Sequence, residues 1–369
     1  LFIVFENPRA IFRIQEIANT LHPYFVGGSL GWHDFLASTA RLFRHDPNYR
    51  IPVKADPNIV INHIKESHLI LRNSLTPFGA LAIGGMYGTL YEEGNQKSYE
   101  VSMIGYIKDV ITQMKRNLDG FWVAHPNFVR LGIALIQGYE RYKADSSDTK
   151  LAELVSALVP NPVELPPLLD FVFGEDVDGL EEDDPLYLRG VLAADITVSD
   201  LISNEDEQEV RYNIFQALQY LADWLCGNGC VALPAKLRNQ HGEDIFVRIM
   251  DDLATTERSR WELWAEIHHG RVSLSDFEQW FKEECLFIQA NQDSVDQKIQ
   301  VRWQGQAAKW YPTAIQLLHQ LVTDDNPVEF VPELLLPFSL DLIRDAENPF
   351  EKAQELHSRY KNYSLDWLN

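Results

Sequence analysis

The sequence lacks any apolar run long enough to cross a bilayer, which takes about 20 residues. It is also poor in cysteine. Its three cysteines include Cys226 and Cys230, about one helical turn apart, and an odd number at this spacing does not form a disulfide framework. We therefore expect a protein that does not span a membrane and that works in a reducing, cytoplasmic compartment.

Positive charge is in short supply. The chain has 32 Lys and Arg residues against 54 Asp and Glu residues, which gives a net charge of −22. A chain this acidic is not expected to bind the phosphate backbone of nucleic acid. An anionic ligand would need a locally basic pocket. The sequence also has no GxSxG segment and no Walker loop, so neither a hydrolase elbow nor a P-loop is predicted.

The 369 residues, 46% of them hydrophobic, are enough for two domains with sizeable cores. In residues 1–145, short apolar runs alternate with helical stretches, which predicts βα units and a parallel sheet. Several of these runs end in Gly or polar residues, as barrel strands do on the active-site face. The predicted strands are Phe2–Phe5, Tyr24–Gly27, Ile59–Ile61, Ala80–Ile83 and Phe121–Ala124. About five strands cannot close a (β/α)₈ barrel, which needs eight.

The rest of the chain changes character twice. Residues 146–195 are acidic and punctuated by Pro and Gly, which predicts a linker or surface loop. Residues 196–345 show the apolar spacing of amphipathic helices, and residues 346–369 form a polar tail. The helices predicted in this part are Val210–Leu225, Thr256–His268, Leu274–Ala290 and Ala307–Leu321.

Three segments carry a specific signal. Residues 119–126 read DGFWVAHP, residues 223–230 read DWLCGNGC and residues 250–261 read MDDLATTERSRW. Together they resemble the malate synthase family, which writes these segments roughly as DGTWVAHP, AWLRGNGCVP and MEDAATAEISRxQ. The resemblance implies a (β/α)₈ TIM barrel with a C-terminal all-helical domain. Residues 1–145 would then be the second half of the barrel.

The same resemblance implies an activity. Malate synthases are acyltransferases of the glyoxylate cycle that condense acetyl-CoA with glyoxylate to give malate and CoA. The arginine that stabilises the enolate oxygen in that family lies upstream of the strand that opens this chain. We therefore expect this chain to be a fragment, or to be completed by a second polypeptide, and to be inactive alone.

Two acidic residues match the family's Mg²⁺ ligands. Residues 6–17, ENPRAIFRIQEI, resemble its ETLPAAFQMDEI stretch, and residues 27–35, GGSLGWHDF, resemble its GLNxGRWDY stretch. The resemblance assigns Glu6 and Asp34 as metal ligands, and two carboxylates completed by substrate oxygens and water suit Mg²⁺. Taken alone, a Glu before Asn-Pro is instead a turn or helix-cap residue.

The resemblance also implies substrate contacts at Gly31, His33, Trp122 and Pro126. His33 stands where the family usually has Trp, which puts the shape of the glyoxylate pocket in question. Trp122 and Pro126 are expected along the pantetheine channel of acetyl-CoA. Without the resemblance, Trp122 is equally well explained as a core aromatic residue.

Asp252 matches the second acid of the family's MEDAAT segment, which is the general base that removes a proton from the acetyl methyl group. Asp251 would then be the acid that starts the following helix. Without the resemblance, the pair is simply a helix cap. Residues 231–249 are longer than in the family, and this excursion either covers the CoA phosphates or bulges into solvent.

Three other functions stay open, one of which is a purely structural helical scaffold. The altered segment around His33 suggests a related Claisen enzyme or lyase that acts on another 2-oxoacid. The missing half-barrel and the long segment before Asp252 suggest a non-catalytic relative that binds CoA or another protein.

Overall fold

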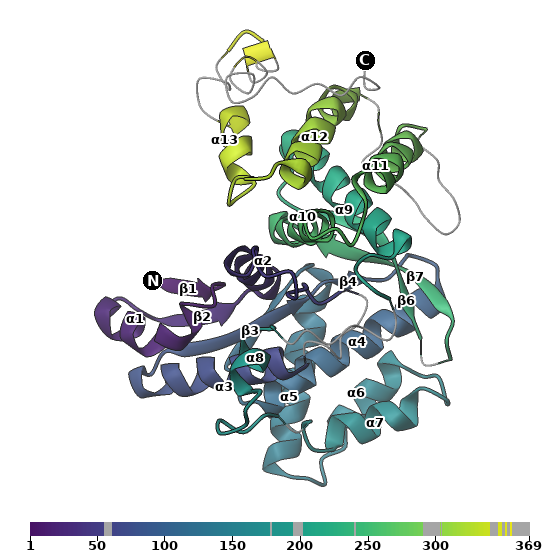
Figure 1. The fold of residues 1–369 in the computed structure, drawn as a ribbon. Helices are drawn as coiled ribbons and strands as arrows, with labels where there is room; N and C mark the ends of the chain where they lie inside the picture. The colour runs from purple at the N-terminus through teal and green to yellow at the C-terminus, as the bar shows by residue number, and fades with distance from the viewer. Residues whose placement is uncertain are drawn as a thin grey trace. The chain divides into compact units, whose positions relative to one another are not determined.

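In the computed structural model (Figure 1) the described residues are 1–54, 61–177, 179–194, 202–239, 241–290, 303, 305–339, 346–348, 351–352 and 355. The chain forms two units that each draw on separate stretches of sequence. The first unit takes residues 1–39, 57–195 and 234–250, and the second takes residues 40–56, 196–233 and 251–369. Each unit is described by itself.

A parallel sheet organises the first unit. Its strand order is β1-β2-β3-β5, and every neighbouring pair is parallel. The strands are β1 (Phe2–Phe5), β2 (Gly27–Leu30), β3 (Leu81–Tyr87) and β5 (Gly120–Val123). This confirms the predicted βα architecture. Of the predicted strand Ile59–Ile61, residues 59–60 lie outside the described residues and Ile61 begins a helix.

Helices cover one face of this sheet. Figure 1 shows α1 and α3 along that face, and the buried side chains of Phe5, Ile14 and Leu71 join them to β1 in one core. Because side chains alternate along a strand, Phe2 and Val4 point to the other face, where they are exposed. The helices of the βα units are α1 (Ile14–Leu21), α2 (Trp32–Leu42), α3 (Ile61–Leu75), α4 (Gln96–Lys115) and α5 (Asn127–Ala144).

Residues 146–195 contain more structure than a linker. Three helices form here: α6 (Lys150–Leu158), α7 (Leu165–Phe173) and α8 (Tyr187–Val191). Apolar side chains of α6 and α7, including Val155 and Leu168, are buried in the core that α4 and α5 supply. Prolines at the start of α7 fit because the first turn of a helix has no use for their missing N–H groups. The linker interpretation is wrong for residues 150–173.

Residues 231–251 form two strands rather than an irregular excursion. A second sheet has the order β4-β7-β6, made of β4 (Thr89–Leu90), β6 (Val231–Arg238) and β7 (Asp244–Asp251). β4 pairs antiparallel with β7, so that Thr89 lies opposite Ile249. The region 196–345, which the sequence predicts to be helical, therefore also contains strands.

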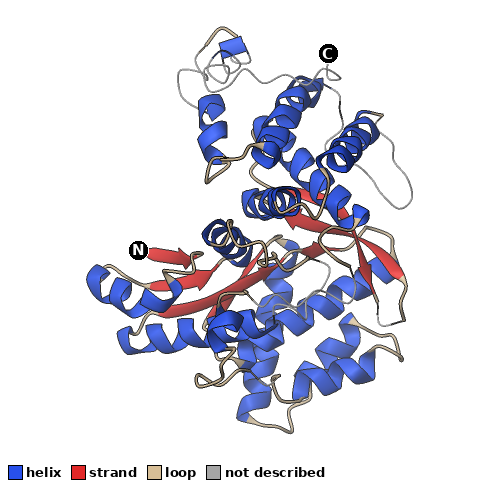
Figure 2. Ribbon diagram, in the orientation of Figure 1, coloured by secondary structure: helices blue, strands red, loops and turns tan. Residues whose placement is uncertain are grey.

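Helices build the second unit (Figure 2). Its core includes Leu218 of α9, Leu263 of α10, Phe281 of α11 and Leu318 of α12, all buried. This confirms the four predicted helices. The elements are α9 (Glu207–Leu225), α10 (Leu253–His268), α11 (Leu274–Gln289), α12 (Gly305–Thr323) and α13 (Pro332–Ser339). Across the described residues, none of the helices combines the length and apolar character that a bilayer crossing requires.

Candidate active site

Glu6 and Gly31 lie at the same edge of the parallel sheet. Glu6 follows β1 and Gly31 follows β2, and the last residues of these strands, Phe5 and Leu30, are paired. The Glu6 side chain lies directly against Gly31. A β-carbon added to Gly31 would stand 2.6 Å from Glu6 Cγ and 2.7 Å from Glu6 Cδ. Only glycine therefore leaves room for the carboxylate in this position.

Asp34 lies in the first turn of α2, the helix that begins directly after Gly31. A carboxylate at this end of a helix is stabilised by the helix dipole. His33 precedes it, and its ring accepts a hydrogen bond at Nε2 from Trp32 Nε1 over 3.1 Å. Glu6 and Asp34 thus follow neighbouring parallel strands, with Gly31 between them in the loop. Among the described residues, no group of three or more His, Cys, Asp or Glu side chains could hold a metal ion.

Trp122 lies on the same face of the sheet as Phe2, opposite the face that packs on α1 and α3. Its ring contacts the Phe2 ring edge to face, with centroids 5.9 Å apart, although β1 and β5 are the outer strands of the sheet. Trp122 remains 47% exposed, so it is not a core residue between sheet and helices. Pro126 is exposed at the N-cap position of α5. Their assignment to the pantetheine channel stays a prediction.

Asp252 is the N-cap residue of α10. One oxygen of its carboxylate, Oδ1, accepts hydrogen bonds from the backbone N–H groups of Ala254 and Thr255, over 3.0 and 3.3 Å. The Thr255 hydroxyl completes a capping box with the Asp252 backbone. The described residues supply no hydrogen bond to the second oxygen, Oδ2. Oδ1 therefore anchors the carboxylate at the start of α10.

Asp251 does not start the helix, so the role assigned to it from the sequence is wrong. It is the last residue of β7 and is buried at 3% exposure. Burial raises the pKa of its carboxyl to about 7, against the opposing charge of Lys54. The helix dipole stabilises the neighbouring Asp252 instead, because Asp251 still belongs to strand β7 and α10 begins after Asp252.

Two family models match the chain in separate regions. The model described as the malate synthase TIM barrel domain matches residues 2–152, and the model described as the malate synthase C-terminal domain matches residues 204–336. Together they cover about three quarters of the chain. The chain belongs to the malate synthase family.

Similar malate synthases are longer than this chain. The malate synthase of Dictyostelium discoideum is 24% identical over 94% of this chain and 55% of its own length. Malate synthase A of Escherichia coli K12 is 24% identical over 89% of this chain and 52% of its own length. The chain spans about half the length of these relatives.

A solved structure of the Haloferax volcanii malate synthase, a ternary complex with pyruvate and acetyl-CoA, is also similar. It covers 76% of this chain and 60% of its own, with 12% identity and a TM-score of 0.36.

Two glycines outside the predicted site have structural explanations. Gly84 lies within β3, and a β-carbon on it would stand 2.7 Å from Cδ of the Gln113 side chain of α4. Gly227 ends α9 at a φ of +100°, which glycine adopts without strain, and Asn228 N then donates to Asp223 O. The GNG segment therefore follows a helix, as expected for a helix stop rather than a dinucleotide loop.

Two basic residues of the segment 231–251, Arg248 of β7 and His241 between the strands, lie beside carboxylates. Arg248 Nε lies 3.0 Å from Glu92 Oε2, and His241 Nε2 lies 3.2 Å from Glu164 Oε1. These contacts favour a structural role for this malate synthase segment over a cover for CoA phosphates.

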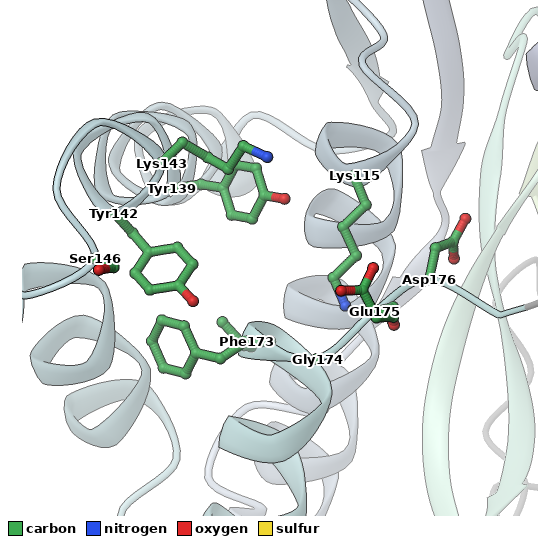
Figure 3. Close-up of a pocket in the computed structure, with 10 residues that line it drawn as sticks. Lys115, Tyr139, Tyr142, Lys143, Ser146, Phe173, Gly174, Glu175 and Asp176 are labelled. Atoms are coloured by element: carbon green, nitrogen blue, oxygen red, sulfur yellow. Dashed lines mark hydrogen bonds between the residues drawn. The ribbon is translucent and has the colours of Figure 1, made fainter.

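A cavity of about 360 Å³ opens elsewhere in the first unit (Figure 3). The aromatic rings of Tyr139, Tyr142 and Phe173 line it, together with Lys115 and Lys143. No residue predicted for the malate synthase site lines it. Its size is typical of ligand pockets, but the acids that could carry the family's chemistry lie elsewhere.

Sequence reasoning missed a set of polar residues buried beside Asp252. Gln216 of α9 and Thr255 and Ser259 of α10 are each 3% exposed or less, and they bond to one another and to Lys54. The available signal was Gln216 itself, a polar residue between Phe215 and Ala217 on a helix that is apolar on several sides.

Proposed function

We propose that the protein is a malate synthase, and that Asp252 is the base that forms the enolate of acetyl-CoA. The observation that carries the proposal is that the two oxygens of the Asp252 carboxylate have different hydrogen-bonding environments. Oδ1 is anchored by the backbone N–H groups of Ala254 and Thr255, which leaves Oδ2 for a proton. A base held at a fixed angle in this way gives the orientation that proton abstraction from carbon requires.

The reaction balances as a Claisen condensation followed by hydrolysis. Asp252 takes one proton from the acetyl methyl group, and the resulting enolate carbon forms a bond to the aldehyde carbon of glyoxylate. The aldehyde oxygen takes up a proton and becomes the hydroxyl of the product. Water then attacks the thioester carbonyl, the C–S bond breaks, and malate and CoA leave.

We assign Glu6 and Asp34 of the first unit as the ligands of a magnesium ion. Glu6 rests in the space that Gly31 leaves by lacking a β-carbon, and Asp34 follows in the next helical turn. Two carboxylates, completed by water and substrate oxygens, are a donor set that suits Mg²⁺. When bound, the ion would supply positive charge that orients glyoxylate and stabilises the developing alkoxide.

His33 favours a second candidate. Its ring is held by the hydrogen bond from Trp32, at a position where the family usually has Trp. A titratable ring there suits a related Claisen reaction on a different 2-oxoacid. Gly31, His33, Trp122 and Pro126 are the residues that we assign to substrate contact in either case, and the three free cysteines fit a cytoplasmic location.

The test is acyl-donor-dependent release of CoA by the complete protein with glyoxylate, pyruvate and 2-oxobutyrate in parallel. We expect glyoxylate to give the highest kcat/KM. We expect Asp252→Asn to lower kcat by at least about 100-fold while the affinity for acetyl-CoA is unchanged, the scale for loss of a general base. Near-normal turnover in that variant would overturn the assignment of the base, and a preference for another 2-oxoacid would select the second candidate.

A further inference from the structure

A continuous line of hydrogen bonds runs through the second unit from Lys54 to Asp252. Lys54 Nζ donates to Ser259 Oγ over 2.5 Å, and Ser259 Oγ donates to Gln216 Oε1 over 2.8 Å. Gln216 Nε2 donates to Thr255 Oγ1 over 3.0 Å, and Thr255 Oγ1 donates to Asp252 O over 2.7 Å. The line joins the segment before residue 55 to α9, to α10 and to the N-cap of α10.

Lys54, at the start of this line, sets the donor-to-acceptor direction of every hydrogen bond in it. A Lys ammonium has donors only, so Ser259 must accept from Lys54 and give its own proton to Gln216 Oε1. The amide of Gln216 is thereby turned with its NH₂ group toward Thr255.

Thr255 lies between this line and two acids, because its side chain also hydrogen-bonds the buried Asp251 carboxyl. Its hydroxyl accepts from Gln216 Nε2 and from Asp252 N, the latter over 3.2 Å, and donates to Asp252 O. The Thr255 backbone N–H meanwhile holds Asp252 Oδ1.

We propose that Lys54 is a positioning residue for the Asp252 carboxylate, acting through Ser259, Gln216 and Thr255. This inference rests on the proposed function of Asp252 as a base. An uncharged residue at 54 would let the Ser259 hydroxyl and the Gln216 amide reverse, so that Gln216 Nε2 no longer holds the Thr255 hydroxyl. The N-cap of α10 would then be more mobile, and the Asp252 carboxylate would approach the acetyl methyl group at varying angles.

The charged groups around Lys54 make this line of hydrogen bonds sensitive to pH. Lys54 faces Arg258 and Glu262 of α10, Glu209 of α9 and Asp251 of β7, and its ammonium lies 5.3 Å from the centre of the Tyr212 ring. Burial, aided by the charge of Arg258, lowers the pKa of Lys54 to about 8. Below that pH the ammonium is a donor only. Above it, the neutral amine can accept, and the direction of the line is lost.

The experiment compares Lys54→Met and Lys54→Arg in the complete protein. We expect Lys54→Met to lower kcat by about 10- to 100-fold with the acetyl-CoA KM within about twofold, the scale for a misplaced catalytic group. Lys54→Arg stays charged and a donor, so it should retain most of kcat and move the alkaline fall of kcat to higher pH. Gln216→Leu should repeat the effect of Lys54→Met. The exposed Lys97, which pairs with Glu243, supplies the matched control Lys97→Met with unchanged kcat.

A double-mutant cycle separates positioning from a general structural effect. In an Asp252→Asn background, Lys54→Met should cause no further loss of kcat, because the group it positions is already gone. An additional loss of about 10-fold there, or an unchanged kcat in Lys54→Met alone, would overturn the proposal.

A readout that needs no activity keeps the two proposals distinct. Amide hydrogen exchange at Ala254 and Thr255 should rise at least about 10-fold in Lys54→Met relative to the rest of α10. If the wild-type protein released no CoA, the proposed function would fail while this exchange still decided whether Lys54 orders the cap. Unchanged exchange at both amides would overturn the positioning role.

Discussion

The carboxylate of Glu6 occupies the space that a side chain on Gly31 would fill. The two residues follow paired parallel strands, so the close approach is set by the register of β1 and β2 and not by a flexible loop. A glycine immediately before α2 thus fixes where Glu6 points, close to the turn that carries Asp34.

This relationship predicts the effect of Gly31→Ala. The added methyl group would displace the Glu6 side chain, and we expect the affinity for Mg²⁺, measured by titration calorimetry, to fall at least about 10-fold, the scale for disturbing the support of a metal ligand. Gly85→Ala is the matched control, since a β-carbon there meets nothing within 4 Å. Equal Mg²⁺ affinities in both variants would remove Glu6 from the metal site.

Substitutions of Asp252 are predicted to have different effects on the stability of the protein and on its turnover. Asn caps helices as well as Asp does, so Asp252→Asn should leave the free energy of unfolding within about 0.5 kcal/mol of wild type, whereas Asp252→Ala should lose about 1 kcal/mol. Both variants should lose turnover. Urea denaturation followed by circular dichroism measures the first effect. A large loss of stability in Asp252→Asn would show that the carboxylate charge itself is structural.

Two buried histidines of α3 should make the first unit sensitive to acid. Burial lowers the pKa of His63 to about 4, and burial together with Arg116 lowers that of His68 to about 3. Their unfolded forms take up protons near pH 6.5, so the unfolded state binds more protons between that pH and the folded pKa. Stability is therefore lost as the pH falls, by about 2 kcal/mol for each histidine between pH 7 and pH 5.

The measurement is amide hydrogen exchange of α3 at these two pH values, corrected for the intrinsic effect of pH on exchange. Arg116 Nη1 lies 3.1 Å from His68 Nδ1, which accepts its hydrogen bond in the neutral ring. In His68→Gln an amide oxygen can accept the hydrogen bond from Arg116 without titrating. The loss of stability between pH 7 and pH 5 should therefore shrink by about half. His22→Gln, at an exposed position, is the control and should not change it. A pH-independent α3 in the wild type would contradict the prediction.

Arg260 should be essential to the second unit. Its fully buried guanidinium lies 2.9 Å from Glu257 Oε2 and donates to the carbonyl oxygens of Val328 and Glu329. Arg260→Met would leave the Glu257 carboxylate buried without its cation, which costs about 3–5 kcal/mol of unfolding free energy. Thermal unfolding measures the loss. The exposed Arg13, paired with Glu16, gives the control Arg13→Met with no measurable change.

The sequence predicted elements well where one apolar pattern dominated. Phe2–Phe5 was placed at its observed bounds as β1, and Leu274–Ala290 matches α11 within a residue. β2 was placed three residues early, because Gly27 and Gly28 read as the end of a strand. They are in fact paired with β3, and the Phe5 ring packs over Gly28 where a side chain would stand.

The remaining errors share a physical cause. In residues 146–195, short helices such as α7 were hidden by prolines and acids that are harmless in first turns and on exposed faces. At the candidate site, the family resemblance identifies Asp252, but the pattern of two adjacent acids assigns the start of the helix to Asp251. Which of the two starts the helix depends on where β7 ends. Lys54 lies far from Gln216 and Ser259 in sequence, so only folding brings the three together.

The arrangement at residue 252 also determines which substitutions leave the folding of the protein intact while removing the proposed activity. A cap requires one acceptor oxygen, which Asn, Ser and Thr supply as readily as Asp. The proposed chemistry requires a second, basic oxygen on the same short side chain, which Asp supplies and those three do not. Selection for cellular abundance alone would therefore tolerate all four residues at this position. A pool of variants at residue 252 can be sorted first by abundance and then by growth that depends on the reaction. The residues found at this position should be restricted to Asp only after the second step.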